Sequence, residues 1–364
     1  MRPIIVIGMH RSGSSALTHL LTSFGYYFGE SDDGIGAGKE NQKGFWERKD
    51  VRSVNDQILY GMKCEWDCIS QFNFSALSPL EFNEYVNKAS TVIQGLEKVQ
   101  SNWVMKEPRV CLTYPIWKSA LDEKPLIIYI HREPIEIANS LYHRNKLPIN
   151  YGLDLWYRYS AFALNNINNH DVLFLSYSQL SLSPVETVSK IAQFLRLNSQ
   201  EFVMPSNEQI TSIIDPKLKH QKSSQPNQGL SECHIKLNSY IYNLISKNST
   251  HNFDFDFDLE PSDILDSALC ERSLFFDKYI EYKEKSRLIN EFSTKLKSKR
   301  DCLTSDINIL KESKSSLLNQ NKTLSERAKH LNEELSELRW KSENPSYRSI
   351  VRDIGRYIKR KIAR

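Results

Sequence analysis

The stretch RPIIVIGMHRSGSS (residues 2–15) decides the fold of the N-terminal region. Its apolar run, residues 4–7, predicts a buried strand, because a continuous apolar run suits a sheet covered on both faces. Gly8 and Gly13 bracket a tight turn, and a helix is expected over residues 14–24. A strand, a glycine-bearing loop and a helix start expose several backbone N–H groups to an anion. The stretch therefore predicts a phosphate-binding loop.

The loop lacks the lysine of nucleotide-hydrolysing phosphate loops. In those proteins a lysine follows the second glycine and reaches the β- and γ-phosphates, whereas here Ser14 follows Gly13. A kinase or nucleotide hydrolase remains an alternative, but this substitution and the lack of a clear magnesium-binding aspartate disfavour it. Arg11 supplies a cation from inside the loop, in a position suited to the bridging oxygen of a leaving phosphate. The loop thus indicates a phosphate ligand other than ATP.

The first 200 residues continue this alternation of strands and helices. Strands alternating with helices predict an α/β fold, with a parallel sheet that carries helices on both faces. The polar segment 198–231 is expected to be a loop, and the alternating segment 253–259 suits either an edge strand or a linker. Further strands are expected at 103–106, 126–131 and 172–177, and further helices at 81–100, 134–144 and 184–195.

A second group of polar residues follows the apolar run 126–131. Arg132 comes directly after this predicted strand, where open α/β sheets bind their ligands. Ser140 and Arg144 lie four residues apart on the next predicted helix and therefore share one face. Two guanidinium groups and a hydroxyl suit a second, separate phosphate group. The alternative is that both arginines form ordinary ion pairs with neighbouring glutamates.

Together, the two motifs resemble those of sulfotransferases that use 3′-phosphoadenosine 5′-phosphosulfate (PAPS). The run 11–15, RSGSS, resembles the family's 5′-phosphosulfate loop, in which Thr is commoner than Ser14. Arg132 and Ser140 match its 3′-phosphate motif, and Arg144 matches an arginine that some members add. The resemblance covers about residues 1–225 and implies a P-loop-like sulfotransferase core.

The resemblance also implies which residues contact PAPS and which groups are not needed. Tyr177 resembles a tyrosine that approaches the 3′-phosphate, and the basic segment 217–222 resembles one that closes over the nucleotide. No metal is required, and the sequence has no metal-ligand cluster. The expected PAPS-binding residues are His10, Arg11, Ser12, Gly13, Ser14, Ser15, Arg132, Ser140, Arg144, Tyr177, Lys217 and Lys219.

Sulfuryl transfer to a hydroxyl, such as that of a carbohydrate, needs a base and a cation at the leaving phosphate. Glu47 in KGFWER is the expected base, because related sulfotransferases use a glutamate after the first helix. Glu40 and His10 are its rivals, and Glu47 is alternatively a helix-terminal acid. Lys106 at a strand end resembles a family lysine and, with Arg11, completes the expected catalytic set. The alternative for Lys106 is an ordinary surface lysine.

A leucine recurs every seventh residue in the C-terminal part. Such a repeat is typical of a coiled coil, and a pairing of two copies is expected. The alternative to the coiled coil is a single long helix packed on its own domain. The alternative to an enzyme is a nucleotide-binding scaffold without catalysis, assembled through this coiled coil. The leucines are Leu296, Leu303, Leu310, Leu317, Leu324, Leu331 and Leu338. The expected domains are a sulfotransferase domain (1–255), a connector (256–284), a coiled coil (285–340) and a basic amphipathic tail (345–364).

The tail and the bulk composition bear on location. The tail places basic and apolar residues on different helical faces, which suits either an anionic membrane surface or a solvated terminal helix. The net charge of +4 does not favour nucleic-acid binding, and six cysteines without a CxxC pair suit a reducing compartment. No apolar run is long enough for a transmembrane helix. A cytoplasmic protein, peripheral at the inner membrane face, is expected.

Overall fold

The structure is a computed structural model that describes residues 2–30, 32–36, 44–214, 229–247, 249–251, 253, 255 and 263–362 of the 364-residue chain. The chain divides into two compact units, Met1–Ile280 and Glu281–Arg364. The expected sulfotransferase domain (1–255) and most of the expected connector (256–284) fall in the first unit, and the expected coiled coil and tail lie within the second. Each unit is described by itself.

A five-stranded sheet forms the centre of the first unit, in the order β2-β1-β3-β4-β5. Its strands are β1 (Ile4–Ile7), β2 (Val104–Lys106), β3 (Leu126–His131), β4 (Asp171–Ser176) and β5 (Ser249–His251). The helices are α1 (Ser14–Ser23), α2 (Lys49–Gly61), the 3₁₀ turn η1 (Phe74–Ala76), α3 (Pro79–Glu97), α4 (Val110–Ala120), α5 (Pro134–Asn145), α6 (Ile149–Ile167), α7 (Tyr177–Leu182), α8 (Pro184–Leu197), α9 (Asn207–Ile213) and α10 (Glu232–Ser246).

The first four strands run parallel, as the sequence predicts. Ile4 of β1 pairs with Val104 of β2 on one side and with Leu126 of β3 on the other. Strand β4 continues the parallel ladder beside β3, whereas the short β5 pairs antiparallel with β4 at the sheet edge. Parallel strands need helical crossovers, and the intervening helices supply them. The carboxyl ends of β1 to β4 therefore meet at one edge of the sheet.

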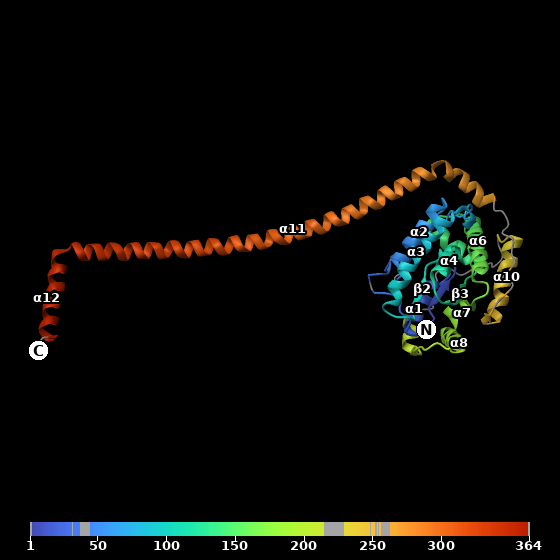
Figure 1. Ribbon diagram of the computed structural model, residues 1–364, viewed down its shortest axis with the longest axis horizontal. Coiled ribbons are helices and arrows are strands. Elements are labelled where there is room, and N and C mark those ends of the chain that lie inside the picture. Colours follow the sequence, from blue (N-terminus) through green and yellow to red (C-terminus); the bar gives the residue numbers. More distant parts are fainter. Residues whose placement is uncertain are drawn as a thin grey trace. The chain divides into compact units, whose positions relative to one another are not determined.

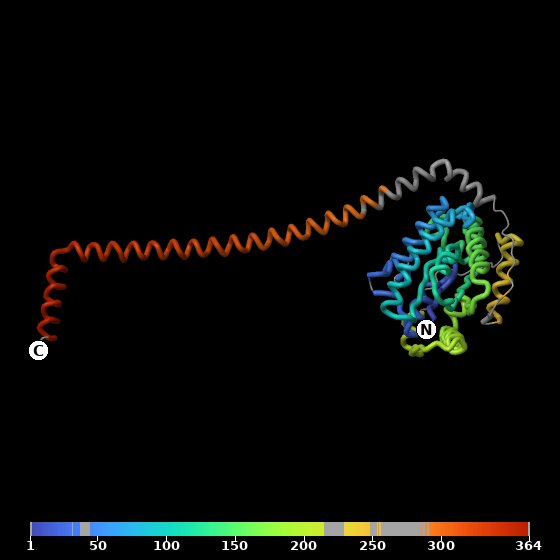
Figure 2. Tube along the Cα trace, viewed as in Figure 1, coloured from blue at the N-terminus to red at the C-terminus, as the bar shows by residue number. Residues whose placement is uncertain are grey.

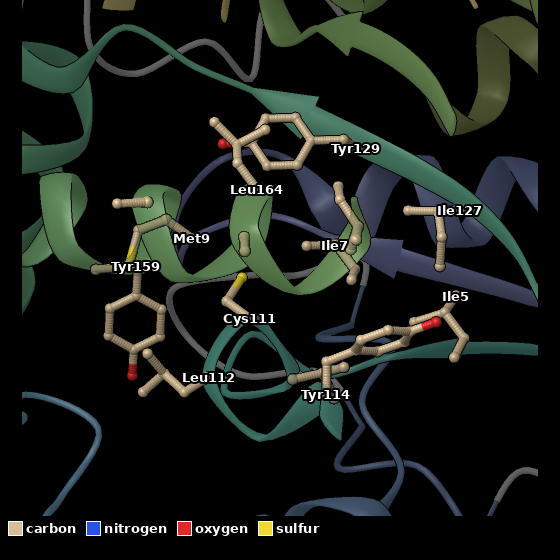
Figure 3. Packing of buried hydrophobic residues seen from close by; sticks show 14 of the residues in the cluster. Ile5, Ile7, Met9, Cys111, Leu112, Tyr114, Ile127, Tyr129, Tyr159 and Leu164 are labelled. Atoms are coloured by element: carbon tan, nitrogen blue, oxygen red, sulfur yellow. The ribbon is translucent and has the colours of Figure 1, made fainter. Parts of the chain in front are cut away.

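Helices cover both faces of this sheet (Figure 1). Alternate residues of β1 face opposite layers: Ile5 and Ile7 join a cluster with α2, α3, α4, α6 and α10, whereas Ile4 and Val6 pack against α1, α8 and α9. Figure 3 shows part of the first cluster, which includes Ile5 of β1, Ile127 of β3 and Tyr114 of α4. This two-sided burial explains why the strands read as continuous apolar runs rather than alternating ones.

Two segments differ from the sequence-based expectation, and a third lies mostly outside the described residues. Segment 198–231 was expected to be a loop, but it contains α9, whose capping box joins Ser206 and Gln209. Helix α9 has only seven residues, so its apolar period is too short to be recognised. Tyr177 begins a short helix instead of ending a strand. In segment 253–259 only Phe253 and Phe255 lie within the described residues, and both are buried.

A buried polar network joins α2, the segment after β2 and α4. The Asn55 side chain donates to Glu107 (2.6 Å) and accepts hydrogen bonds from Thr113 (2.6 Å) and Trp117 (2.8 Å). Arg109 pairs with both Glu107 and Asp56, so the buried carboxylate of Glu107 has a cationic partner. Pairing satisfies polar groups that would be costly to bury alone. The network fixes the chain immediately after Lys106.

The second unit is helical. Helix α11 spans Asp263–Glu343 and therefore begins before the predicted coiled coil; it is continuous through the leucine repeat (Figure 2). Pro345 begins helix α12 (Pro345–Ile362), because proline fits the first helical turn, where no N–H partner is needed. Within the described parts of the chain, no helix combines the length and apolar character needed to cross a bilayer.

We expect Asn55→Ala to reduce the free energy of unfolding by about 2–4 kcal/mol, because the carboxylate of Glu107 and the indole N–H of Trp117 each lose a buried partner. Urea unfolding measures this change. Gln57→Ala, on the same helix but with an exposed side-chain hydrogen bond, is the control and should change stability by less than about 0.5 kcal/mol. Equal losses in the two variants would contradict the role of the network.

Candidate functional site

The residues expected to act together emerge at the carboxyl edge of the sheet. The glycine loop follows β1, Lys106 ends β2, Arg132 follows β3 and Tyr177 follows β4. Because these strands are parallel neighbours, their ends lie side by side. The four segments therefore converge although they are up to about 170 residues apart in sequence.

The glycine loop wraps tightly against the fourth strand end. Gly13 has φ +91°, and a Cβ there would lie 2.2 Å from Cδ2 of Tyr177. Only glycine gives both this left-handed conformation and this close approach. Arg11 also has a positive φ, 70°, which is uncommon for a residue with a side chain. Met9 anchors the loop in the buried cluster shown in Figure 3.

The loop ends at the start of α1, which presents a suitable anion site. Its N-cap is Gly13, which has no side-chain acceptor, and the first turn contains no acidic residue. The first backbone N–H groups of a helix have no intrahelical partner, and the helix dipole places positive charge there. The hydroxyl of Ser12 is buried and has no hydrogen-bond partner among the described residues. This orphaned donor and the uncapped helix fit a phosphate or phosphosulfate group.

A second cluster joins the loop to β3 and α5. Arg11 Nε donates to Ser140 Oγ (2.9 Å), and Arg132 Nη1 donates to the carbonyl oxygen of Arg11 (3.0 Å). The Arg132 guanidinium lies 4.7 Å from the centre of the Tyr177 ring. It also pairs with Glu136 (2.8 Å), one of the glutamates that the sequence offered as an alternative partner. Arg132 is thus held in place by its contacts with the loop, Tyr177 and Glu136.

Lys106 and Glu47 form a buried ion pair on the other side of the loop. Lys106 Nζ donates to Glu47 Oε1 (2.6 Å), to Ser15 Oγ (3.1 Å) and to the carbonyl oxygen of Phe45 (2.9 Å). The Lys106 side chain is 2% exposed, so it is not a surface lysine. Glu47 lies two residues before α2, rather than within its first turn. One ammonium group therefore ties the phosphate loop to the expected base.

The charges around Glu47 keep it ionised. Burial alone raises the pKa of its carboxyl, but the adjacent Lys106, with Arg109 and Arg52 farther away, outweighs burial and holds the pKa below its usual value. A carboxylate that is ionised at neutral pH can accept a proton. Its lone pairs are partly engaged by Lys106, which makes it a weaker base than an unpaired carboxylate.

His10 lies against two aromatic residues: Trp66, which the sequence offers as a residue that could stack on an acceptor sugar, and Tyr159, which the sequence did not single out. The His10 ring centre is 4.8 Å from that of Trp66 and 5.7 Å from that of Tyr159. Burial, followed by the charges of Arg109 and Lys106, lowers the pKa of His10 well below its usual value, so the imidazole is neutral. Its Nε2 is buried and has no hydrogen-bond partner among the described residues. Composition and spacing gave no signal for these contacts between distant segments.

Of the remaining candidates, Arg144 lies near the site, and the others lie outside the residues that the structure describes. Arg144 is exposed and lies over the ring of Phe45 (5.6 Å), on the side of the Lys106 pair. Lys217, Lys219 and Glu40 lie outside the described residues. Within the described parts of the chain, no cluster of His, Cys, Asp and Glu is arranged to hold a metal ion.

The arrangement fits a ligand with two phosphate-like groups. The loop and the start of α1 offer backbone donors to one group, and Arg132 with Ser140 offers side-chain donors to the other. Arg11 touches the second cluster directly, so the two subsites are adjacent. The ion pair of Lys106 and Glu47 borders the first subsite through Ser15.

Comparisons with known proteins bear on the family of the chain. Two solved structures resemble the chain: the sulfotransferase domain of the Synechococcus PCC 7002 olefin synthase (16% identity, TM-score 0.40, covering 70% of this chain and 96% of that one) and the sulfotransferase domain from the curacin biosynthetic pathway (13% identity, TM-score 0.42, covering 66% and 96%). No curated protein sequence matches. The sulfotransferase domain family matches residues 1–273. Since that match runs over far more than half of the 364 residues, the chain belongs to the sulfotransferase domain family.

Proposed function

We propose that the protein is an enzyme that transfers a sulfuryl group from PAPS to a hydroxyl group, which a carbohydrate would supply. The observation that carries the proposal is the pair of adjacent phosphate subsites, one formed by the loop and one by Arg132 and Ser140. A bisphosphorylated adenosine has one group for each subsite, whereas a triphosphate tail does not. Membership of the sulfotransferase domain family supports the same donor.

The donor supplies the activated sulfuryl group. The residues of the chain bind the donor, orient it toward the acceptor and deprotonate the acceptor hydroxyl. We assign the 5′-phosphosulfate to the loop residues 11–15 and the 3′-phosphate to Arg132, Ser140 and the ring of Tyr177. The bond from sulfur to the phosphate oxygen breaks as the bond from sulfur to the acceptor oxygen forms. Arg11 and Lys106 would stabilise the negative charge that develops on the leaving phosphate.

Glu47 is the residue that we assign to take the acceptor proton. It is ionised at neutral pH and borders the phosphate loop through Lys106. Donor binding would draw Lys106 toward the phosphate and weaken its hold on Glu47, which raises the basicity of the carboxylate when it is needed. Trp66 lies beside His10, and Phe45 lies beside Lys106 and Arg144. Both rings suit stacking on a sugar ring, whereas Phe72 belongs to the buried core.

Arg132→Ala should weaken the binding of adenosine 3′,5′-bisphosphate roughly 10- to 100-fold, because the variant loses charge-assisted hydrogen bonds to the 3′-phosphate. Isothermal titration calorimetry measures the change. Arg196→Ala removes an exposed arginine at the end of α8 and should bind like the wild type. If the wild type fails to bind this nucleotide, or binds ATP with magnesium and hydrolyses it, the proposal is wrong.

Glu47→Gln should reduce turnover about 10²- to 10⁴-fold and leave nucleotide binding within about threefold, because it removes a general base but keeps the shape of the side chain. Because neighbouring cations hold the pKa of Glu47 below its usual value, deprotonation by this residue should not limit kcat/KM between about pH 5 and 7. Mass spectrometry of cell-surface glycans incubated with labelled PAPS measures turnover. Glu186→Gln on α8 is the control. Unchanged turnover in Glu47→Gln would show that another residue is the general base, and His10 would be the first to test.

We also propose that two copies of the chain pair through α11. The seven leucines of the repeat are 51–67% exposed, so nothing described in a single chain covers them. A strict seven-residue repeat drifts about 20° per heptad around a straight helix, so only supercoiled helices keep such a stripe in contact. Packing on a compact domain does not require this period. A second copy presents the same stripe at the same spacing, and it is the partner that we assign.

Leu310→Asp combined with Leu317→Asp should convert the dimer to a monomer, because two charges would lie in the apolar seam. Light scattering coupled to size-exclusion chromatography should give twice the chain mass of 42.3 kDa for the wild type and the single mass for the variant. Asn308→Asp combined with Ser315→Asp adds the same charges on the outer face and should remain dimeric. A monomeric wild type would contradict this pairing.

A further inference from the structure

Helix α12 separates its apolar and basic residues onto opposite faces. At about 100° per residue, its large apolar side chains fall within an arc of about 140°, and its arginines fall on the remaining surface. All of these apolar side chains are exposed, from 41% for Tyr347 to 80% for Ile362. The apolar residues are Tyr347, Ile350, Val351, Ile354, Tyr357, Ile358 and Ile362.

The opposite face is strongly cationic. The helix contains six Lys and Arg residues but a single carboxylate, Asp353, which is 3.6 Å from Arg356. Arg348 and Lys359 flank the apolar arc on one side, where their ammonium or guanidinium groups can extend from an apolar layer into water. Lys361 lies inside the arc near its C-terminal end, with Nζ 5.7 Å from the centre of the Tyr357 ring.

We propose that α12 binds in the plane of an anionic lipid bilayer, with its apolar face among the acyl chains and its cations at the phosphates of the headgroups. A large apolar arc joined to a basic face is the pattern of interfacial helices. Tyr347 lies within the apolar arc and Tyr357 lies at its edge. Tyrosine favours the headgroup level of a membrane. This inference does not depend on the reaction proposed for the first unit.

Other partners fit the helix less well. A second copy packed on the apolar arc would cover the apolar side chains but would leave the cationic faces of both helices without an anionic partner. Nucleic acid would use the cations but would leave seven apolar side chains in water. A span across the bilayer would bury the cations in hydrocarbon, at high cost. An anionic surface alone satisfies both faces of α12 at once.

The test is co-sedimentation of the full chain with unilamellar vesicles. The wild type should bind vesicles of equal parts phosphatidylglycerol and phosphatidylcholine and bind pure phosphatidylcholine vesicles at least roughly tenfold more weakly. Binding to the anionic vesicles should decrease in about 1 M salt, because exposed charges are then screened. Equal binding to the two kinds of vesicle, or to neither, would overturn the proposal.

Three matched variants separate the two faces. Ile354→Gln with Ile358→Gln removes apolar contacts without adding charge and should weaken binding roughly tenfold. Arg352→Gln with Arg356→Gln should weaken it roughly fivefold for each cation removed. Ser346→Gln with Ser349→Gln introduces the same residue type on the polar face and should bind like the wild type. Glutamine is a good helix former, so all three variants should keep their helical circular dichroism.

The variants also identify the competing partners. If the Ile354 and Ile358 variant binds vesicles normally but sediments as a smaller species than the wild type, the apolar face belongs to a second copy and the proposal fails. If the chain binds duplex DNA in preference to the anionic vesicles, and the apolar variant retains that binding, the cations serve nucleic acid and the proposal fails as well.

Discussion

Strand β1 pairs in parallel with β2 on one side and with β3 on the other, and this buried ladder determines where each functional segment emerges. All neighbouring strands with site residues end at the same edge, so the glycine loop, Lys106 and Arg132 reach one place from distant parts of the sequence. The two apolar layers of helices hold the ladder from both sides. A sheet with reversed β3 would place Arg132 at the opposite edge, far from the loop.

Charge pairing governs the chemistry at this edge. The buried cations at this edge have carboxylate partners. Lys106 pairs with Glu47, and Arg132 pairs with Glu136. Arg109 pairs with Glu107 and Asp56. Burial of an unpaired charge would be costly, and the pairs avoid that cost. Among the described residues, the hydroxyl of Ser12 has no hydrogen-bond partner and no side chain caps the start of α1. An incoming anion therefore meets backbone N–H groups first and can exchange partners with the cations around it.

The chain joins this site to a second unit of different character. Helix α11 carries a repeat suited to pairing, and α12 carries a face suited to an anionic surface. If both proposals hold, a dimer would present two copies of α12 to one membrane, and linked binding of this kind increases overall affinity without new contacts. The second unit would then control where the sulfuryl transfer occurs, while the first unit controls the reaction.

The sequence by itself determined the strand, loop and helix of residues 2–24, three further parallel strands and the long C-terminal helix, because continuous apolar runs, glycine spacing and heptads are local signals. The tertiary structure decided what local signals cannot carry. In the folded chain Arg11 donates a hydrogen bond to Ser140, and Lys106 donates one to Glu47. The rings of Trp66 and Tyr159 contact His10, and the Arg144 guanidinium lies over the ring of Phe45. These contacts join residues that are 56 to 149 positions apart in sequence, and only the order and direction of the strands bring them together.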